Sequence, residues 1–314
     1  MDAFIAHHLK GVSRTYAILI PRLPRALGEP VGLAYLLMRV IDTAEDAPDL
    51  SVEQRHGYLA ALDGTLASGG EFPAELVQPI GALPAEQKLM QEVPEVLSRI
   101  GRLDSAYGEA IRTCARRMIA GVAEFARRSA QRGLPYPAIR DAEELRAYCY
   151  YVAGVVGEML CRMMAHYLKL PQLETLSALA VELGVGLQMV NILKDALQDS
   201  CQGRRYLPTP VGDEVSHAEI YKAVLAEART SLQKGVEFVL ALPAQAASLR
   251  SFCGLQIVWG ALTLARAERD PAHAKISRPT VRSSIARLTR LAADDEALRR
   301  WLGRLLRTPH PAPG

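Results

Sequence analysis

Apolar residues recur at helical spacing along almost the whole chain. After Ser105 they return every three or four positions and form one stripe: Tyr107, Ile111, Cys114, Met118, Val122 and Phe125. This spacing is typical of a long amphipathic helix. The same pattern predicts helices over about 30–45, 143–166, 173–199 and 244–267. No segment alternates with period two for long enough to predict a strand, so we expect an all-α protein.

The breaks between these helices fall at short turn-forming sequences. They stand at 63–64, 68–70, 133–135, 170–171 and 270–271. Residues 67–84 resemble a long loop, and no internal repeat marks a helical solenoid. We therefore expect a single domain over residues 1–314, whose Pro-rich tail, 308–314, is predicted to be disordered.

Composition excludes some classes of protein. The 314 residues carry a formal net charge of +3, from 37 Lys and Arg against 34 Asp and Glu. This balance argues against nucleic-acid binding, which usually needs a strongly basic surface. The five cysteines lack paired spacing, which favours reduced thiols in a cytoplasmic protein over disulfides or zinc. We see no signal peptide, and the longest uncharged stretch, 251–265, is too short to span a bilayer.

Two acidic segments carry the candidate chemistry. In the first, Arg39, Asp42 and Asp46 are three and four positions apart, so on a helix they share one face. Tyr35 lies one turn earlier. In the second, polar residues step by three, four and four along an otherwise apolar helix: Gln188, Asn191, Asp195 and Asp199.

Either acidic pair alone fits a solvated helix face. Two pairs, each in an otherwise apolar helix, are harder to explain as solvated faces. Carboxylates one turn apart also repel unless cations lie among them. Oxygen ligands without nearby His or Cys favour Mg²⁺, which takes one or two carboxylates, waters and substrate phosphates. The pattern therefore predicts an enzyme that ionises a diphosphate. A helical interaction protein, with both pairs in solvent, is the non-enzymatic alternative.

The sequence resembles the squalene/phytoene synthases, head-to-head prenyl transferases of the isoprenoid synthase fold. The resemblance runs from about Ser13 to Lys275 and rests on five blocks in order: 13–16, 35–46, 148–157, 186–208 and 252–253. It implies one helical bundle around a central cavity. Its first aspartate motif and residues 252–256 look like squalene synthases, whereas residues 203–208 look more like phytoene synthases.

The resemblance also assigns roles to single positions. The implied Mg²⁺ ligands are Asp42, Asp46, Asn191, Asp195 and Asp199. The implied contacts to prenyl diphosphate are Ser13, Arg14, Thr15, Tyr35, Arg39, Gln188, Lys194 and Arg204. Tyr148 matches a tyrosine near the reacting carbons and joins the four aspartates as the implied catalytic set. Two positions depart from the family: Lys194 replaces a usual Arg, and Gln198 replaces a common acid.

The activity implied by the resemblance is Mg²⁺-dependent condensation of two farnesyl diphosphates. The reaction would pass through presqualene diphosphate and end at squalene with NADPH as reductant. NADPH is implied by the resemblance alone, because no Gly-x-Gly-x-x-Gly follows a strand. Synthesis of phytoene, dehydrosqualene or presqualene diphosphate without reductant is the nearest alternative. A class I terpene cyclase is a more distant alternative, since the second motif of such enzymes differs from the pattern of Asn191, Asp195 and Asp199 in this chain.

An arginine-rich helix from Arg282 to Arg307 closes the predicted fold. Its arginines form either a solvated face or a surface that docks on anionic lipid. We therefore expect a cytoplasmic protein, with peripheral membrane contact as the alternative. The sequence does not indicate an oligomeric state.

Overall fold

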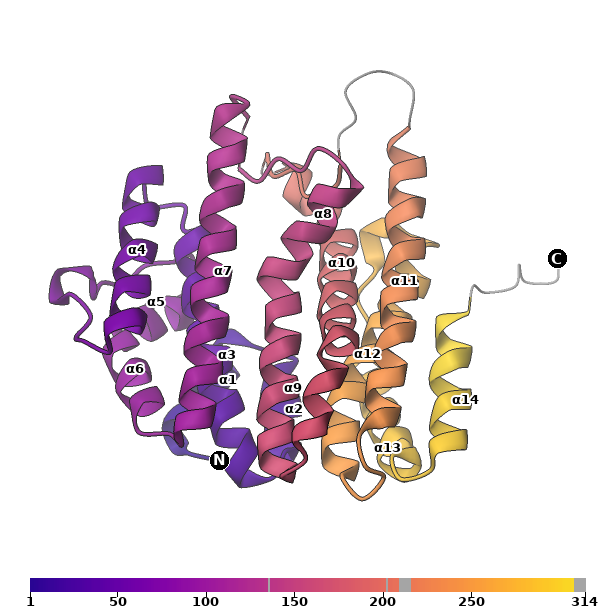
Figure 1. Ribbon diagram of the computed structural model, residues 1–314. Coiled ribbons are helices and arrows are strands. Elements are labelled where there is room, and N and C mark those ends of the chain that lie inside the picture. The colour runs from indigo at the N-terminus through magenta and orange to yellow at the C-terminus, as the bar shows by residue number, and fades with distance from the viewer. Residues whose placement is uncertain (135, 202, 209–215, 308–314) are drawn as a thin grey trace. The chain divides into compact units, whose positions relative to one another are not determined.

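The computed structural model describes residues 1–134, 136–201, 203–208 and 216–307 (Figure 1). These residues form helices and turns without a strand, and one isolated bridge pairs Ala138 with Arg205. The all-α class is therefore confirmed. The tail predicted to be disordered, 308–314, lies outside the described residues.

The chain divides into two compact units. Unit 1 comprises residues 1–123 and 162–171, and unit 2 comprises 124–161 and 172–314. Two helices, α7 (Ser105–Gln131) and α9 (Val155–Leu168), contribute residues to both units. The single domain expected from the sequence stays a prediction, and we describe each unit separately.

Unit 1 is organised around α3 (Arg25–Asp46), which packs against α1, α4, α5 and α6. These helices are α1 (Ala3–Val12), α4 (Val52–Ser68), α5 (Pro84–Gln91) and α6 (Val93–Gly101), with the short α2 (Tyr16–Leu19) beside them. The apolar stripe of α3 is at most 2% exposed: Leu27, Leu33, Leu36, Leu37, Val40 and Ile41. Burying each such side chain contributes roughly 1.5–3 kcal/mol, so α3 is held by its core face.

Local sequence sets the ends of these helices. Asp2 accepts the backbone N–H groups of Phe4 and Ile5 at the start of α1. Ser51 and Gln54 form a reciprocal capping box at the start of α4. Gly69 ends α4 with a φ of +69°, a left-handed conformation that favours glycine.

Unit 2 is organised around α10 (Ser177–Cys201), which packs against α8, α11, α12 and a short π-helix, η3. Its elements include α8 (Ala142–Cys149), η3 (Tyr150–Gly154), α11 (His217–Ala241), α12 (Ala247–Ala267), α13 (Arg278–Leu291) and α14 (Asp295–Leu306). The helix predicted over 143–166 is therefore interrupted by one π turn. The helices predicted near 30–45, 173–199 and 244–267 are present with slightly different ends.

The prediction of one arginine-rich C-terminal helix was wrong. The chain forms α13 and α14, which are separated by residues 292–294. Asp294 caps α14 by accepting the N–H of Ala297. The guanidinium of Arg250, which is 2% exposed, donates to the carbonyl of Ala292 at the end of α13. These two bonds satisfy backbone groups that a continuous helix would have paired internally.

One helical stretch, Pro171–Cys201, is long and apolar enough to cross a membrane by length and composition. The core helix of a soluble protein meets the same criteria. This stretch contains α10, the central packed helix of unit 2, and it carries the polar residues of the second acidic segment.

Glycines let the neighbours of α10 approach its backbone. A Cβ at Gly157 of α9 would lie 2.1 Å from the carbonyl oxygen of Ala180 on α10. A Cβ at Gly184 of α10 would lie 2.2 Å from the carbonyl oxygen of Ala153 in η3. On another side, a Cβ at Gly186 would lie 3.1 Å from a backbone nitrogen in α11. A side chain is therefore excluded at Gly157 and Gly184, and Gly186 leaves little room for one.

We predict that Gly184→Ala strongly destabilises the protein, because a methyl group there overlaps backbone that cannot rotate away. Overpacking of this kind costs about 3 kcal/mol or more, which urea unfolding followed by circular dichroism would measure. The matched control is Gly303→Ala in α14, where no atom lies within 4 Å of the added Cβ. That change should stabilise by about 0.5–1 kcal/mol through helix propensity. Equal unfolding midpoints for the two variants would contradict the close packing.

Candidate functional site

The first acidic segment forms one face near the end of α3. Tyr35, Arg39 and Asp42 are half-buried there, and Asp46 is exposed one turn beyond Asp42. Burial raises the pKa of the Asp42 carboxyl to about 7; the charge of Asp46 adds to this, and Arg39 opposes it. The carboxylates predicted to share a face therefore do so, and they repel each other.

Arg39 is held by a residue that sequence reasoning did not identify. Its guanidinium donates to the carboxylate of Glu86, a buried residue of α5. Glu86 also accepts the backbone N–H of Leu83 at 3.1 Å, which fixes the carboxylate at the start of α5. Burial lowers the pKa of Arg39, but Asp42 and Glu86 together raise it above its usual value. The Nε of Arg39 is buried and has no hydrogen-bond partner among the described residues.

The N-terminal segment packs on the same face of α3. The hydroxyl of Tyr35 is hydrogen-bonded to the side chain of Ser13, and burial raises the pKa of this tyrosine. Ser13 also accepts the N–H of Tyr16, whose ring lies 4.7 Å from that of Tyr35. The adjacent Arg14 and Thr15 have exposed side chains. The structure thus brings Ser13 to the first motif and leaves its two neighbours at the surface.

The second acidic segment occupies the last turns of α10. Asp195 and Asp199 are half-buried, as is Gln188 two turns earlier, whereas Asn191 is exposed. Lys194 joins two predicted ligands: its ammonium donates to the amide oxygen of Asn191 at 3.2 Å and lies 3.1 Å from the Asp195 carboxylate. The ammonium contacts these two oxygens as a compact charge, without the planar fork that an arginine would present.

A tight turn follows the second motif. Gly203 adopts a φ of +76°, which a residue with a side chain would rarely adopt. Arg204 then donates its backbone N–H to the carbonyl of Asp199 at 2.9 Å, so its half-buried side chain stays beside the end of α10. Arg205 exchanges backbone hydrogen bonds with Pro137 and Ile139, which ties this turn to the segment before α8.

Tyr148 lies in an aromatic cluster within unit 2. It is 3% exposed, and its ring centroid is 5.5 Å from that of Tyr206 and 5.4 Å from that of Phe125. Tyr206 belongs to residues 203–208, the segment that looks more like phytoene synthases, but the sequence alone did not connect it with Tyr148. Phe125 was expected only as part of the apolar stripe of α7.

The five cysteines are free thiols, as expected. Four are buried, and burial raises the pKa of Cys253 to about 12 and that of Cys149 further. Cys201, the last residue of α10, is the exposed one.

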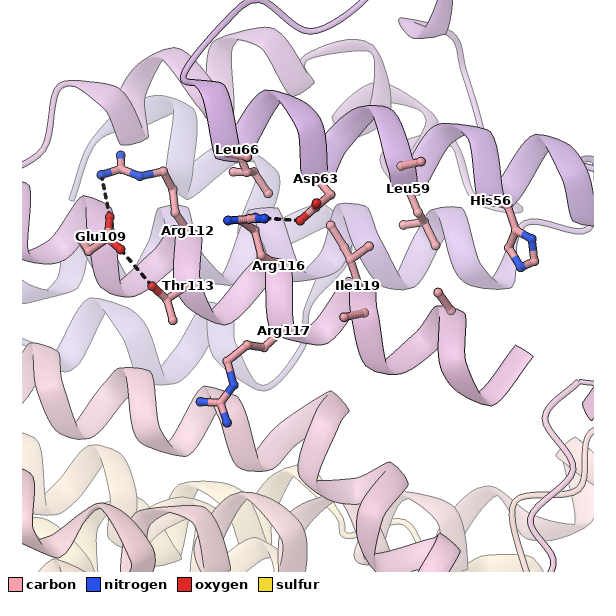
Figure 2. A pocket seen from close by; sticks show the side chains of 14 residues that line it. His56, Leu59, Asp63, Leu66, Glu109, Arg112, Thr113, Arg116, Arg117 and Ile119 are labelled. Atoms are coloured by element: carbon pink, nitrogen blue, oxygen red, sulfur yellow. Dashed lines mark hydrogen bonds and ion pairs between the residues drawn. The ribbon is translucent and has the colours of Figure 1, made fainter. Parts of the chain in front are cut away.

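A cavity of about 750 Å³ lies elsewhere in unit 1, between α4 and α7 (Figure 2). Leu59, Leu66 and Ile119 line it with apolar surface, and Arg116 reaches Asp63 across it with a nitrogen–oxygen distance of 2.8 Å. None of the predicted site residues lines this cavity.

Comparison with known proteins decides the family. The squalene/phytoene synthase family model matches residues 9–287. The chain belongs to the squalene/phytoene synthase family. Members of this family are prenyl-transferase-type enzymes, and the matched range includes every position at which we predicted a site residue.

Individual relatives agree with this assignment. A squalene synthase of Schizosaccharomyces pombe is 26% identical over 274 residues, which cover 82% of this chain and 58% of that protein. The structure of TcSQS with the ligand BPH1237 matches with a TM-score of 0.80, at 24% identity, over 96% of this chain and 89% of that one. A dehydrosqualene synthase structure matches with a TM-score of 0.58 at 19% identity, over 91% and 94%. The chain spans about half the length of the curated relatives it matches.

The aspartate motifs have the chemistry that Mg²⁺ requires. Among the described residues, no group of three or more His, Cys, Asp or Glu side chains is gathered as a complete metal site. Mg²⁺ needs only one or two carboxylates, with waters and substrate phosphates completing its coordination. Asp42 and Asp46 supply such a pair on α3, one turn apart on the same face of the helix. The residues present therefore fit the ion.

We predict that Asp42→Asn stabilises the protein above pH 7 in a buffer containing a chelator. A carboxyl whose pKa rises on folding, here from 3.8 to about 7, binds more protons in the folded state. Its contribution to stability is therefore full below pH 4 and is lost as the pH rises through 7. The variant should gain about 1 kcal/mol or more at pH 8 and lose this advantage near pH 4, as measured by urea unfolding.

The matched control for this variant is Asp49→Asn, which changes an exposed aspartate just beyond α3. It should alter stability by less than about 0.5 kcal/mol at either pH. An Asp42→Asn variant that is less stable than the wild type at pH 8 would contradict the assigned burial.

We further predict that Glu86→Gln destabilises the protein, because it leaves the half-buried guanidinium of Arg39 without its ionised partner. The expected loss is about 1–3 kcal/mol in the free energy of unfolding. Glu75→Gln, at an exposed position before α5, is the control and should change little. If both variants unfold at the same urea concentration, Glu86 does not hold Arg39.

Proposed function

We propose that the protein condenses two farnesyl diphosphates head to head in a Mg²⁺-dependent reaction. The observation that carries this proposal is the family match over residues 9–287, with both aspartate motifs intact on α3 and α10. The names of the matched relatives support squalene as the end product. Because the chain spans about half of their length, the activity named for these relatives is a proposal for this chain, and the experiment below tests it.

The residues of α3 are suited to hold a diphosphate. Asp42 and Asp46 present carboxylate oxygens one turn apart, and Arg39 presents a guanidinium whose position is fixed by Glu86. Tyr35 and Ser13 close this face through their hydrogen bond. When bound, Mg²⁺ would supply Lewis-acid stabilisation of the departing diphosphate.

The residues of α10 and the turn after it add positive charge beside carboxylates. Lys194 lies between Asn191 and Asp195, and Arg204 follows Asp199. In the proposed reaction, these cations neutralise negative charge as it develops on the leaving group, which is where electrostatic stabilisation is most effective. The buried ring of Tyr148 is proposed to face the reacting carbons, where an aromatic surface stabilises positive charge.

The reductive step separates the two candidate outcomes. Reduction to squalene would require NADPH, and the described residues contain no strand–turn–helix unit with the glycine pattern of a dinucleotide site. We therefore derive no step through NADPH. A product formed without reductant, such as dehydrosqualene or presqualene diphosphate, is the second candidate. The turn at 203–208 and the structural match to a dehydrosqualene synthase favour it.

The deciding experiment is to incubate the purified chain with farnesyl diphosphate and Mg²⁺, with and without NADPH, and to analyse the products by mass spectrometry. Squalene formed only with NADPH supports the first candidate. The same head-to-head product in both reactions supports the second. Cyclised monomers of farnesyl diphosphate, or no turnover in either reaction, would contradict the proposal.

We predict that Asp42→Asn and Asp195→Asn each lower kcat/KM for farnesyl diphosphate by roughly 100-fold or more, because each removes a charge that holds the ion and its diphosphate. The matched control is Asp63→Asn, which breaks an ion pair with Arg116 and belongs to neither motif, and it should leave kcat/KM within about two-fold. Unchanged turnover in either motif variant would rule out the two-motif mechanism.

A further inference from the structure

The helix α13 carries an unusual distribution of charge. Its fourteen residues include four arginines and no acid: Arg278, Arg282, Arg287 and Arg290. All four are exposed. Residues 266–307 as a whole hold eleven Lys or Arg against five Asp or Glu, a net charge of +6, whereas the whole chain has +3. The remainder of the chain is therefore slightly acidic, and the positive charge is concentrated around α13.

The fold does not neutralise this charge. Among the described residues, no carboxylate forms an ion pair within 4.0 Å of the arginines of α13. Arg278 and Arg282 are four positions apart and Arg287 and Arg290 are three apart, so both pairs repel on neighbouring turns. Arg278 also lies in the first turn of the helix, where the dipole disfavours positive charge, whereas Arg290 lies in the last turn, where the dipole favours it. Folding therefore leaves an electrostatic cost that an anionic partner would remove.

The other face of α13 is fixed to unit 2. Ser284 of α13 accepts the indole N–H of Trp259 on α12 at 2.8 Å. Leu288 of α13 is fully buried and lies against Gly254 of α12. Arg287 covers the ring of Trp301 on α14 at 4.9 Å. The exposed residues of α13 are its four arginines together with small or polar residues and Pro279, whereas its large apolar side chains, Val281, Ile285, Leu288 and Leu291, are half-buried or buried.

We propose that α13 docks the protein on the anionic headgroups of a lipid bilayer. The arginines spread across the whole solvent-facing half of the helix, which fits a broad layer of negative charge. Nucleic acid is the competing polyanion, and the slightly acidic remainder of the chain disfavours a long strand extending beyond the patch. Because every fully exposed long side chain of α13 is an arginine, the docking is electrostatic, so it requires anionic lipid and fails at high salt. This inference does not depend on the proposed activity.

The test is co-sedimentation of the full chain with sucrose-loaded vesicles. Vesicles of phosphatidylcholine with 30% phosphatidylglycerol should bind the protein in low salt, and neither pure phosphatidylcholine nor 0.5 M NaCl should permit binding. A triple variant, Arg278→Gln, Arg282→Gln and Arg290→Gln, should bind roughly 100-fold more weakly, at about five-fold for each arginine. Arg287 is left intact because it packs on Trp301.

Two further variants separate this surface from general charge effects. A matched control removes three exposed arginines elsewhere (Arg25, Arg102 and Arg140) and should keep most of the binding. Replacing the three α13 arginines by Lys should also keep it, because a headgroup layer responds to charge rather than to guanidinium geometry. Circular dichroism confirms that each variant is folded.

The outcomes decide the proposal. Selective binding to anionic vesicles that the Gln variant loses and both other variants retain supports it. Equal binding to neutral vesicles, equal binding by the Gln variant, or loss of binding in the Lys variant overturns it. Binding of a DNA duplex in place of vesicles, with the same dependence on the arginines, also overturns it.

Discussion

The backbone contacts of α10 are the constraint on which the second motif depends. Gly157 and Gly184 let α9 and η3 approach the backbone of α10 so closely that no side chain fits at either position, and Gly186 makes a tight but less extreme contact with α11. Contacts of this kind fix both the rotation of α10 about its axis and its position along it, because a carbonyl group cannot move aside as a side chain can. The face that carries Asn191, Asp195 and Asp199 is therefore set by glycines one to four turns away.

The two motifs relieve repulsion between carboxylates in different ways. On α3, burial favours a proton on Asp42, and Arg39 is shared with Glu86. On α10, the ammonium of Lys194 is close to both Asn191 and Asp195. Protonation of Asp42 therefore depends on pH, whereas the carboxylate of Asp195 has the positive charge of a lysine beside it. This difference gives physical meaning to Lys194, the position at which the chain departs from the arginine usual in its family.

Sequence reasoning captured what depends on local spacing. Helical periodicity placed α3, α7, α10 and α12 but did not identify α11, and steps of three and four placed Asp42 with Asp46 and Asp195 with Asp199 on common faces. It could not show that Glu86 holds Arg39, because that contact joins positions 47 residues apart through packing of α5 on α3. The contact of Tyr148 with Tyr206 was hidden for the same reason. The break at 292–294 involves hydrogen bonds from the side chains of Asp294 and Arg250, and neither these bonds nor the π turn at 150–154 are revealed by a periodic pattern.

The distribution of the cysteines has a practical consequence. Four thiols are inside the protein, and Cys201 alone is exposed, at the junction between α10 and the turn that bears Arg204. A thiol-reactive fluorophore would therefore label the native chain at one place without any engineered substitution. Because that place adjoins the second aspartate motif, the emission of the dye would report when the adjoining turn changes its surroundings. The native sequence thus already contains a site for a spectroscopic label next to the second aspartate motif.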